Sequence, residues 1–158
     1  MPVSSLSFPL PSDEDTARLG VWLASRLAAG DCLALSGPIG AGKSHLARAL
    51  IRAHLGNPAE DVPSPTFTLV QTYAGDPDIW HADLYRLTHP DEVLELGLDE
   101  AFATAITLVE WPERMGAALP ADAIRLTLVP VGDARRAEVA IPNRPALAQA
   151  LARDWGAT

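Results

Sequence analysis

The stretch GPIGAGKS, residues 37–44, decides the fold class of this 158-residue chain. It fits the phosphate-binding loop pattern, in which two glycines frame a turn and a lysine and a hydroxyl residue follow. The short apolar run CLALS (32–36) precedes it, and residues 43–55 carry apolar side chains at helical spacing. A buried strand, a glycine-rich turn and a helix, in this order, are the context that the pattern requires. The stretch therefore predicts a nucleoside triphosphate site.

Each residue type in this loop has a chemical reason to be there. Small residues let backbone N–H groups turn inward and approach phosphate oxygens, and the helix that follows directs its N–H groups at the same anion. Lys43 is the only lysine in the chain, against eleven arginines, and its compact ammonium suits a backbone cradle that a planar guanidinium would not fit. Ser44 offers a hydroxyl to Mg²⁺. The residues expected to bind the phosphates are Gly37, Gly40, Ala41, Gly42, Lys43 and Ser44.

Composition narrows the class of protein. Apolar residues make up 48% of the chain and charged residues 20%, as in ordinary globular proteins. No apolar run is long enough for a membrane span, and the N-terminus lacks a signal-peptide layout, so we expect a cytoplasmic protein. Cys32 is the single cysteine and excludes an internal disulfide. The net charge of −8 argues against direct binding to a phosphate backbone, so any service to nucleic acid would pass through a partner.

Outside the loop, expected helices and strands alternate. Ser12 caps a helix that starts at Asp13 and is stopped by Gly30, and residues 57–66 form a proline-rich loop. Further strands are expected at 67–73, 105–111, 124–131 and 135–141, and in the segment 78–87, where a strand runs into a polar end. Further helices are expected at 88–102 and 145–155. This order predicts a P-loop NTPase three-layer α/β sandwich. Its central sheet is mainly parallel, with an antiparallel C-terminal hairpin, in a single domain over residues 1–158.

Two carboxylates stand where strands are expected to end. Glu110 ends the apolar run Ala-Ile-Thr-Leu-Val, and Asp83 ends the strand that contains Trp-His-Ala. Parallel strands would deliver both side chains to the edge of the sheet beside the phosphate loop. We assign Glu110 to the magnesium shell and Asp83 to orientation of the attacking water or to a second metal contact. From the residues alone, these two assignments are interchangeable.

Three other residues near these carboxylates are candidates. Thr66, in SPTFT (64–68), lies where switch proteins place a threonine that senses the terminal phosphate, although a proline-stiffened turn explains the same spacing. His81 could be a ligand or a base, but a structural histidine near the sheet edge is the commoner outcome. Trp111 is either a core residue or part of a surface that a partner covers.

Five segments together resemble one family. GPIGAGKS, SPTFT, HADLYR, LELGLDE and LVEWPER occur in the order and spacing of the TsaE family of small bacterial ATPases, over about residues 13–136. The phosphate loop alone fits many families, whereas the H-x-D-L-Y-R and V-E-W-P segments after S-P-T-F-T are far more specific. Pro38 and Ile39 differ from the commoner pair of the family, at variable loop positions.

The resemblance implies a P-loop α/β fold, Mg²⁺-dependent ATP hydrolysis and association with the TsaD–TsaB pair that modifies tRNA beside the anticodon. An acidic protein would then reach the tRNA only through these partners. Ser44 and Glu110 match residues expected on Mg²⁺, and Asp83 matches the aspartate that the family requires for hydrolysis. Lys43 and Thr66 are also assigned catalytic roles, Lys43 from the chemistry of the phosphate loop and Thr66 from its place in SPTFT.

The resemblance also points to nucleotide-binding residues near both ends of the chain. Asp13 and Thr16 fall where family members contact the adenine end, and Arg135 or Arg136 matches a basic residue of the family.

Two other functions share these features. A small-molecule kinase has the same loop, fold and size, but it needs an arginine-rich lid, and the segment placed like a lid, residues 112–122, has only Arg114. A nucleotide switch that binds ATP without useful turnover would carry the same sequence features.

Overall fold

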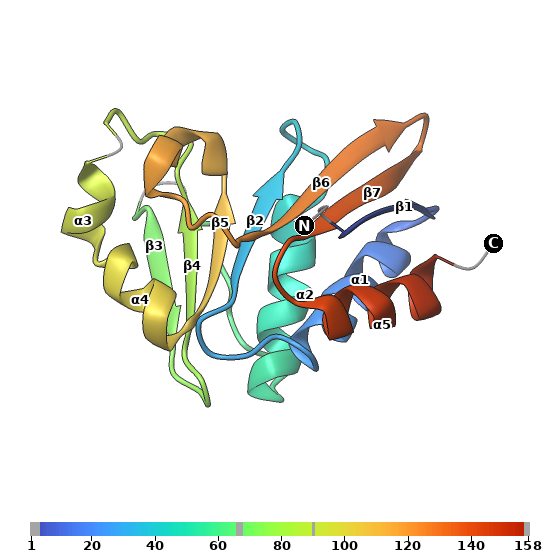
Figure 1. Ribbon diagram of the computed structural model, residues 1–158, viewed down its shortest axis with the longest axis horizontal. Coiled ribbons are helices and arrows are strands. Elements are labelled where there is room, and N and C mark those ends of the chain that lie inside the picture. Colours follow the sequence, from blue (N-terminus) through green and yellow to red (C-terminus); the bar gives the residue numbers. More distant parts are fainter. Residues whose placement is uncertain (1–3, 66–67, 90, 157–158) are drawn as a thin grey trace.

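Seven strands form one mixed sheet in the computed structural model, which describes residues 4–65, 68–89 and 91–156 (Figure 1). The strands are β1 (Ser4–Leu10), β2 (Cys32–Ser36), β3 (Val70–Tyr73), β4 (Ile79–Asp83), β5 (Ile106–Glu110), β6 (Ile124–Val131) and β7 (Ala134–Ile141). Their order across the sheet is β1-β7-β6-β2-β5-β4-β3. The pairings of β6 with β2, β2 with β5 and β5 with β4 are parallel. The outer pairings are antiparallel, including the C-terminal hairpin of β6 and β7.

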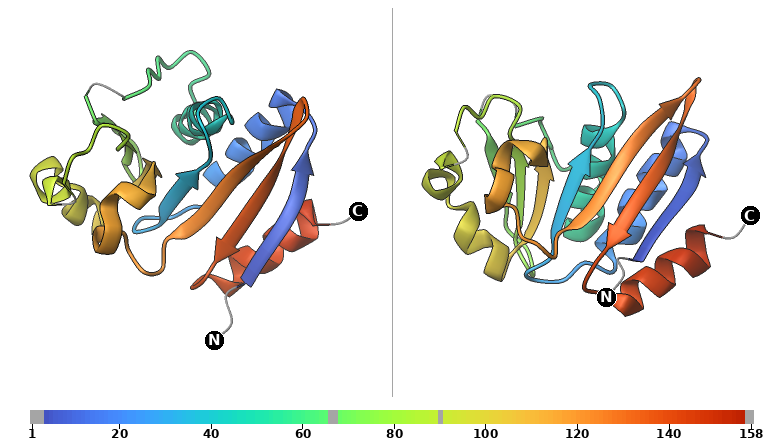
Figure 2. Two further views of the ribbon diagram at one scale, coloured as in Figure 1. Left: turned by 90° about the horizontal axis from the view of Figure 1, so that it is seen from above. Right: turned by 45° about the horizontal axis from the view of Figure 1, so that its top comes forward.

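Helices cover both faces of the sheet. They are α1 (Asp13–Ala24), α2 (Lys43–Leu55), α3 (Glu92–Leu96), α4 (Leu98–Thr104), the 3-10 helix η1 (Pro112–Ala118) and α5 (Pro145–Trp155). One apolar cluster joins α1, α2 and α5 to one face, and a second joins α4 and η1 to the other. In the left view of Figure 2, α1 and α2 lie on one side of the sheet and η1 on the other. The predicted three-layer α/β sandwich with a parallel centre is confirmed.

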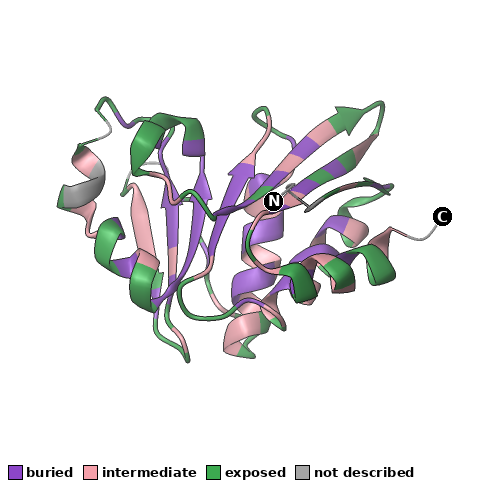
Figure 3. Cartoon of the chain, in the orientation of Figure 1, coloured by how far each residue is buried: buried purple, intermediate pink, exposed green. Residues whose placement is uncertain are grey.

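The central strands of the sheet are almost completely buried. β5 is buried at all five positions and β2 at four of five. Both strands are mainly purple, the colour of buried residues, in Figure 3. Strands that are covered on both faces read as continuous apolar runs, which is why CLALS and AITLV are recognisable in the sequence. No helix in the described ranges is long and apolar enough to span a membrane.

The first strand is not among the predicted elements. In β1, Leu6, Phe8 and Leu10 alternate with Ser5 and Ser7, and the strand pairs with β7 at the edge of the sheet. Its inward side chains join the cluster under α1 and α5, and Phe8 and Leu10 are buried. The alternation is a valid strand signal, but the serines and prolines of this segment favour a loop until an edge pairing is known.

The other differences lie at element boundaries. The expected helix over 88–102 is wrong as a single element, because Gly97 adopts a φ of 82° and separates α3 from α4. The expected strand over 67–73 is shorter, and Leu69, with a φ of 67°, stands just before β3. The first helix starts at its predicted Ser12 cap, where Ser12 and Asp15 form a capping box. It ends at Ala24, well before the predicted stop at Gly30.

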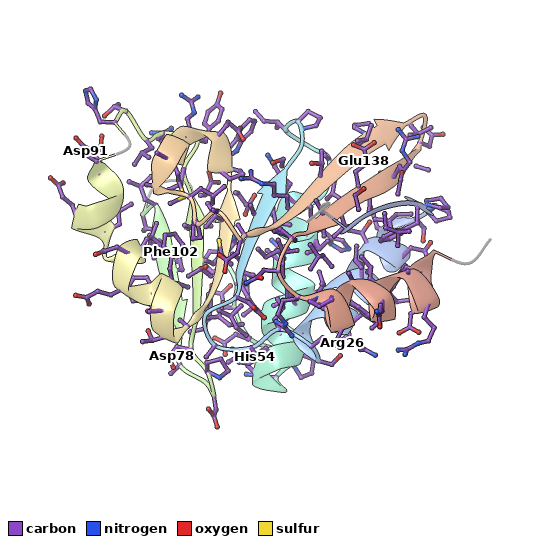
Figure 4. All side chains as sticks on the ribbon, viewed as in Figure 1. Arg26, His54, Asp78, Asp91, Phe102 and Glu138 are labelled. Carbon is purple, nitrogen blue, oxygen red and sulfur yellow. The ribbon has the colours of Figure 1, made fainter. Side chains whose placement is uncertain are left out.

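Polar contacts fasten α5 to α1 at the surface. The indole Nε1–H of Trp22 donates to Asp154 at 2.8 Å, and Arg26, labelled in Figure 4, forms an ion pair with the same carboxylate at 3.4 Å. The rings of Phe8 and Trp155 lie 5.4 Å apart between β1 and α5. The C-terminal helix α5 therefore covers the same apolar cluster against which α1 packs.

Candidate functional site

The phosphate loop lies at the carboxyl edge of the parallel strands. It leaves β2 at Ser36 and enters α2 at Lys43, and β4 and β5 end at the same edge, with Asp83 directly paired to Glu110. Gly37 adopts a φ of 139°, and a Cβ there would stand 2.7 Å from the carbonyl oxygen of Leu128 on β6. This close approach requires glycine, because the loop turns against the neighbouring strand.

A second glycine brings the C-terminal hairpin to the loop. Gly42, the cap residue before α2, has a φ of 105°, and a Cβ there would collide with the guanidinium of Arg135. The same guanidinium donates to the carboxylate of Asp13 at 2.7 Å and to the hydroxyl of Thr16 at 3.2 Å. Three distant parts of the sequence therefore meet beside the loop. The imidazole of His45 extends this group, because its Nε2 lies 3.0 Å from the carbonyl oxygen of Asp13.

Lys43 is buried, with 5% of its surface exposed. Its ammonium donates to the carbonyl oxygen of Gly37 at 2.6 Å and lies 3.5 Å from the ring centroid of Trp111. Burial lowers the pKa of Lys43, and the nearby carboxylates of Glu110, Glu113 and Asp83 oppose this shift. The lysine is thus a desolvated cation surrounded by groups that favour its charge.

Glu110 links the loop to the interior of the sheet. The hydroxyl of Ser44 donates to its two carboxylate oxygens, at 3.3 Å to Oε1 and 3.5 Å to Oε2. Nε2 of His81 lies 2.6 Å from Oε2. Both His81 and Glu110 are almost fully buried, at 1% and 2% exposed.

Asp83 is anchored at the end of β4. It is 5% exposed, its Oδ1 accepts the backbone N–H of Tyr85 at 3.0 Å, and its own N–H donates to the carbonyl oxygen of Leu69 at 2.9 Å. These contacts fix the direction in which the strand delivers the carboxylate. Asp83 and Glu110 therefore stand side by side on neighbouring parallel strands.

A cleft of about 420 Å³ opens over these residues. It is lined by Ile39, Gly40, Gly42, Lys43, Ser44, His45, Ser64, Asp83, Tyr85, Glu110 and Trp111. The rings of Tyr85 and Trp111 form one wall, with centroids 5.0 Å apart. A larger groove of about 650 Å³ runs along α1 and α2, but its described lining includes no carboxylate. Of these two hollows, the first combines a phosphate loop with the acidic groups that a metal–nucleotide complex needs.

The structure thus brings together most of the residues that the sequence singled out. Lys43, Ser44, Asp83 and Glu110 surround the cleft, and Asp13, Thr16 and Arg135 form one group beside Gly42. Their assigned roles stay predictions. The prediction for Thr66 falls outside the described residues, although Ser64 of the same segment lines the cleft.

Two features of the site do not follow from the sequence patterns. Trp111 has a φ of 60°, unusual for a residue with a bulky side chain, and this backbone turn places its indole over Lys43. His81 contacts Glu110, which is not expected of a histidine two residues before the strand end. Strand alternation predicts part of this second feature, because side chains two positions apart, such as His81 and Asp83, point to the same face of the sheet.

The donor chemistry fits Mg²⁺ together with a nucleotide. No group of three or more His, Cys, Asp or Glu residues in the described part of the chain is arranged to hold a metal by itself. Magnesium on nucleotides usually takes one or two protein oxygens and shares the rest with phosphates and water. Ser44, Glu110 and Asp83 offer oxygens of this kind, and a Cβ at Gly40 would meet no atom within 4 Å, which leaves room for phosphate beside the loop.

The chain is similar to known proteins in both sequence and fold. A family model described as "Threonylcarbamoyl adenosine biosynthesis protein TsaE" matches residues 10–137. A tRNA threonylcarbamoyladenosine biosynthesis protein TsaE from Rickettsia bellii (strain RML369-C) is 38% identical over 128 residues, which are 80% of this chain and 88% of the relative. A protein of the same name from Rickettsia conorii (strain ATCC VR-613 / Malish 7) is 43% identical over 105 residues, which are 66% of this chain and 59% of the relative. The crystal structure of Bacillus subtilis YdiB matches with a TM-score of 0.78 at 27% identity, over 97% of each chain.

Proposed function

This chain belongs to the TsaE family of threonylcarbamoyl adenosine biosynthesis proteins. We propose that it is the ATP-binding and ATP-hydrolysing subunit of the tRNA threonylcarbamoyladenosine modification machinery. The observation that supports hydrolysis is the cleft in which Lys43 and Ser44 of the phosphate loop face two strand-end carboxylates. The whole of residues 1–158 would act as one P-loop ATPase domain.

Each group in the cleft has a task in this proposal. The loop N–H groups and Lys43 hold the β- and γ-phosphates, because a desolvated cation in a backbone cradle attracts phosphate strongly. Ser44 and Glu110 would hold Mg²⁺, which when bound would neutralise charge that develops on the phosphate oxygens. Asp83 accepts a hydrogen bond from the attacking water and so orients it toward the γ-phosphorus. We assign Glu110 to the metal because its carboxylate already contacts the Ser44 hydroxyl.

The nucleoside end of ATP would lie toward the group formed by Asp13, Thr16 and Arg135. The guanidinium of Arg135 is 15% exposed and packs against Gly42, so it lies next to the backbone that would hold the phosphates. Asp13 is 72% exposed and keeps acceptor capacity for a ligand. In this arrangement Arg135 joins the adenine end of the site to the phosphate loop.

The proposed partners are the TsaD–TsaB pair, which would carry the tRNA. The chain has a net charge of −8, and such a surface is unsuited to binding an RNA backbone by itself. ATP hydrolysis here would then drive a conformational step in the partner complex, while transfer of the threonylcarbamoyl group takes place elsewhere.

A pair of variants separates ATP binding from turnover. Lys43→Ala should weaken ATP binding roughly 100-fold, which corresponds to about 2.7 kcal/mol, because the cradle loses its cation. Asp83→Ala should bind ATP within about 3-fold of wild type yet hydrolyse it at least about 100-fold more slowly, the usual contribution of a group that handles the attacking water. Calorimetry measures the first effect and phosphate release the second.

The matched control for both variants is Asp99→Ala, which removes an exposed carboxylate on α4. It should leave ATP binding and phosphate release unchanged. Normal hydrolysis by Asp83→Ala would contradict the role assigned to that residue. Rapid formation of a phosphorylated small molecule, in the absence of any protein partner, would favour a kinase instead.

A further inference from the structure

A buried histidine stands behind the carboxylate that we assign to the metal. His81 lies in the middle of β4, next to β5, and its side chain is 1% exposed. Strand alternation directs it to the same sheet face as Ile79 and Asp83, into the apolar cluster covered by α2. A polar ring in such surroundings costs free energy unless a partner compensates it. Glu110 is that partner, with its Oε2 2.6 Å from Nε2 of the ring.

The partners of the two ring nitrogens assign the proton of His81 to Nε2. An ionised carboxylate can only accept hydrogen bonds, so Nε2 of His81 must be the donor. Nδ1 is buried and has no hydrogen-bond partner among the described residues. A lone pair on Nδ1 is the arrangement that leaves no buried N–H group without an acceptor. The ring therefore presents one donor, aimed at Oε2 of Glu110.

This donor fixes the rotation of the carboxylate. Oε2 is the oxygen bonded to His81, and Oε1 is the oxygen nearer to the Ser44 hydroxyl, at 3.3 Å. The terminal torsion of a glutamate side chain is broad when nothing holds it. The Ser44 hydroxyl lies 3.3 Å from Oε1 and 3.5 Å from Oε2, and because Oε2 is bound to the imidazole, Oε1 is the oxygen whose only described partner is this hydroxyl. Ser44, Glu110 and His81 thus form one chain of contacts, from the cleft into the core.

We propose that His81 is a positioning residue for the Mg²⁺ site: its Nε2–H occupies Oε2 of Glu110 and leaves Oε1, together with the Ser44 hydroxyl, as the groups that would hold the metal. This inference rests on the proposed function, because it concerns the metal that accompanies ATP. Hydrogen bonds behind a metal ligand typically change metal affinity 10- to 100-fold when they are lost. A histidine that only filled space in the core would have no such effect on the metal.

Two variants of similar size separate these roles. In His81→Gln the amide nitrogen lies at about the reach of Nε2 and can donate to Glu110. In His81→Asn the amide is one methylene shorter and ends near the position of Nδ1, which has no partner among the described residues. Both variants keep a polar group in the core, so they share its desolvation cost. Thr107→Val is the control, since Thr107 is buried on the same strand as Glu110 but points to the opposite face of the sheet.

The experiment is calorimetric titration of the full chain with β,γ-imido-ATP at stepwise Mg²⁺ concentrations, with melting curves for each variant. In His81→Asn, the Mg²⁺ concentration that gives half of the metal-dependent gain in nucleotide affinity should rise about 10-fold. The affinity for the nucleotide without Mg²⁺ should stay within about 3-fold of wild type. His81→Gln should restore the Mg²⁺ dependence to within about 3-fold of wild type, and Thr107→Val should match wild type.

Equal Mg²⁺ dependence in His81→Asn and wild type would overturn this inference. Equal loss in both His81 variants would overturn it as well, because the donor at the Nε2 position would then be irrelevant. Should His81→Asn fail to fold, His81→Met, which reaches about as far as His81→Gln but has no N–H group to donate, replaces it, and the same shift in Mg²⁺ dependence is expected. A wild-type protein that binds no nucleotide at any Mg²⁺ concentration would instead overturn the proposed function.

Discussion

Lys43 combines contacts that no sequence pattern describes. Its position after the glycines is predictable, because a phosphate cradle needs a compact cation there. Its contact with the Trp111 ring at 3.5 Å is not, because that contact depends on the left-handed backbone of Trp111. In the same way Asp83 and Glu110 could be predicted from strand ends, whereas the contact of His81 with Glu110 depends on the register of two strands and joins residues 29 positions apart. Local sequence patterns therefore identify the candidate side chains, whereas the pairing of distant strands determines which side chains are in contact.

Gly42 offers a test at this scale. Gly42→Ala should lower ATP affinity about 10-fold or more, because alanine resists a φ of 105° at a cost of about 1–2 kcal/mol and its Cβ would also displace the Arg135 guanidinium. Gly56→Ala is the matched control, since Gly56 caps the other end of α2 with a φ of 64° and a Cβ there would meet no atom within 4 Å. It should lose stability by about 1 kcal/mol without a change in ATP affinity. Calorimetry and urea unfolding measure the two effects, and wild-type affinity in Gly42→Ala would contradict this account of the loop.

At the scale of elements, strands that are buried on both faces are easier to predict from the sequence than strands at the edge of the sheet. β2 and β5 are covered on both faces, so their sequences alone indicate strands. β1 is defined by its pairing with β7, which lies near the other end of the chain, and no local signal contains that partner. The segment over 88–102 has good helical spacing, yet one left-handed glycine at 97 divides it. Element type follows from local spacing, whereas element ends depend on single backbone angles and on distant partners.

The contact between α1 and α5 should depend on pH. Hydrogen bonds from Arg153 and Trp22 lower the pKa of Asp154 from 3.8 to about 2. A carboxylate with a lowered pKa in the folded state stabilises the protein above its unfolded pKa, and this contribution is lost as the pH falls from about 3.8 through about 2. Asp154→Asn should therefore be less stable than wild type at pH 6, and the difference should shrink at pH 3.

Urea unfolding of wild type and Asp154→Asn at both pH values measures this difference in the free energy of unfolding. Arg136→Gln is a suitable control, because its ion pair with Glu138 lies within β7 and involves neither α1 nor α5. A stability difference that stays constant or grows between pH 6 and pH 3 would show that Asp154 does not act through its charge.

At the scale of the whole molecule, the fold gathers residues from both ends of the chain around one edge of the sheet. The phosphate loop and the two carboxylates come from the parallel centre, and the antiparallel hairpin adds Arg135, which meets Asp13 at the start of α1. The parallel centre and the hairpin are predictable from the sequence because each has a local pattern. The meeting of Arg135 with Asp13 and Gly42 could be expected only through resemblance to a family, since it joins residues 122 positions apart.

The measurement that tests the central claim most directly is phosphate release from ATP by the wild-type chain, with and without the purified TsaD–TsaB pair, with Asp83→Ala in parallel. We predict slow release by the chain alone, release at least about 10-fold faster with the pair, and no acceleration for Asp83→Ala, because hydrolysis depends on the oriented water. A chain that binds ATP yet releases no phosphate in either condition would contradict the ATPase assignment and identify a nucleotide switch.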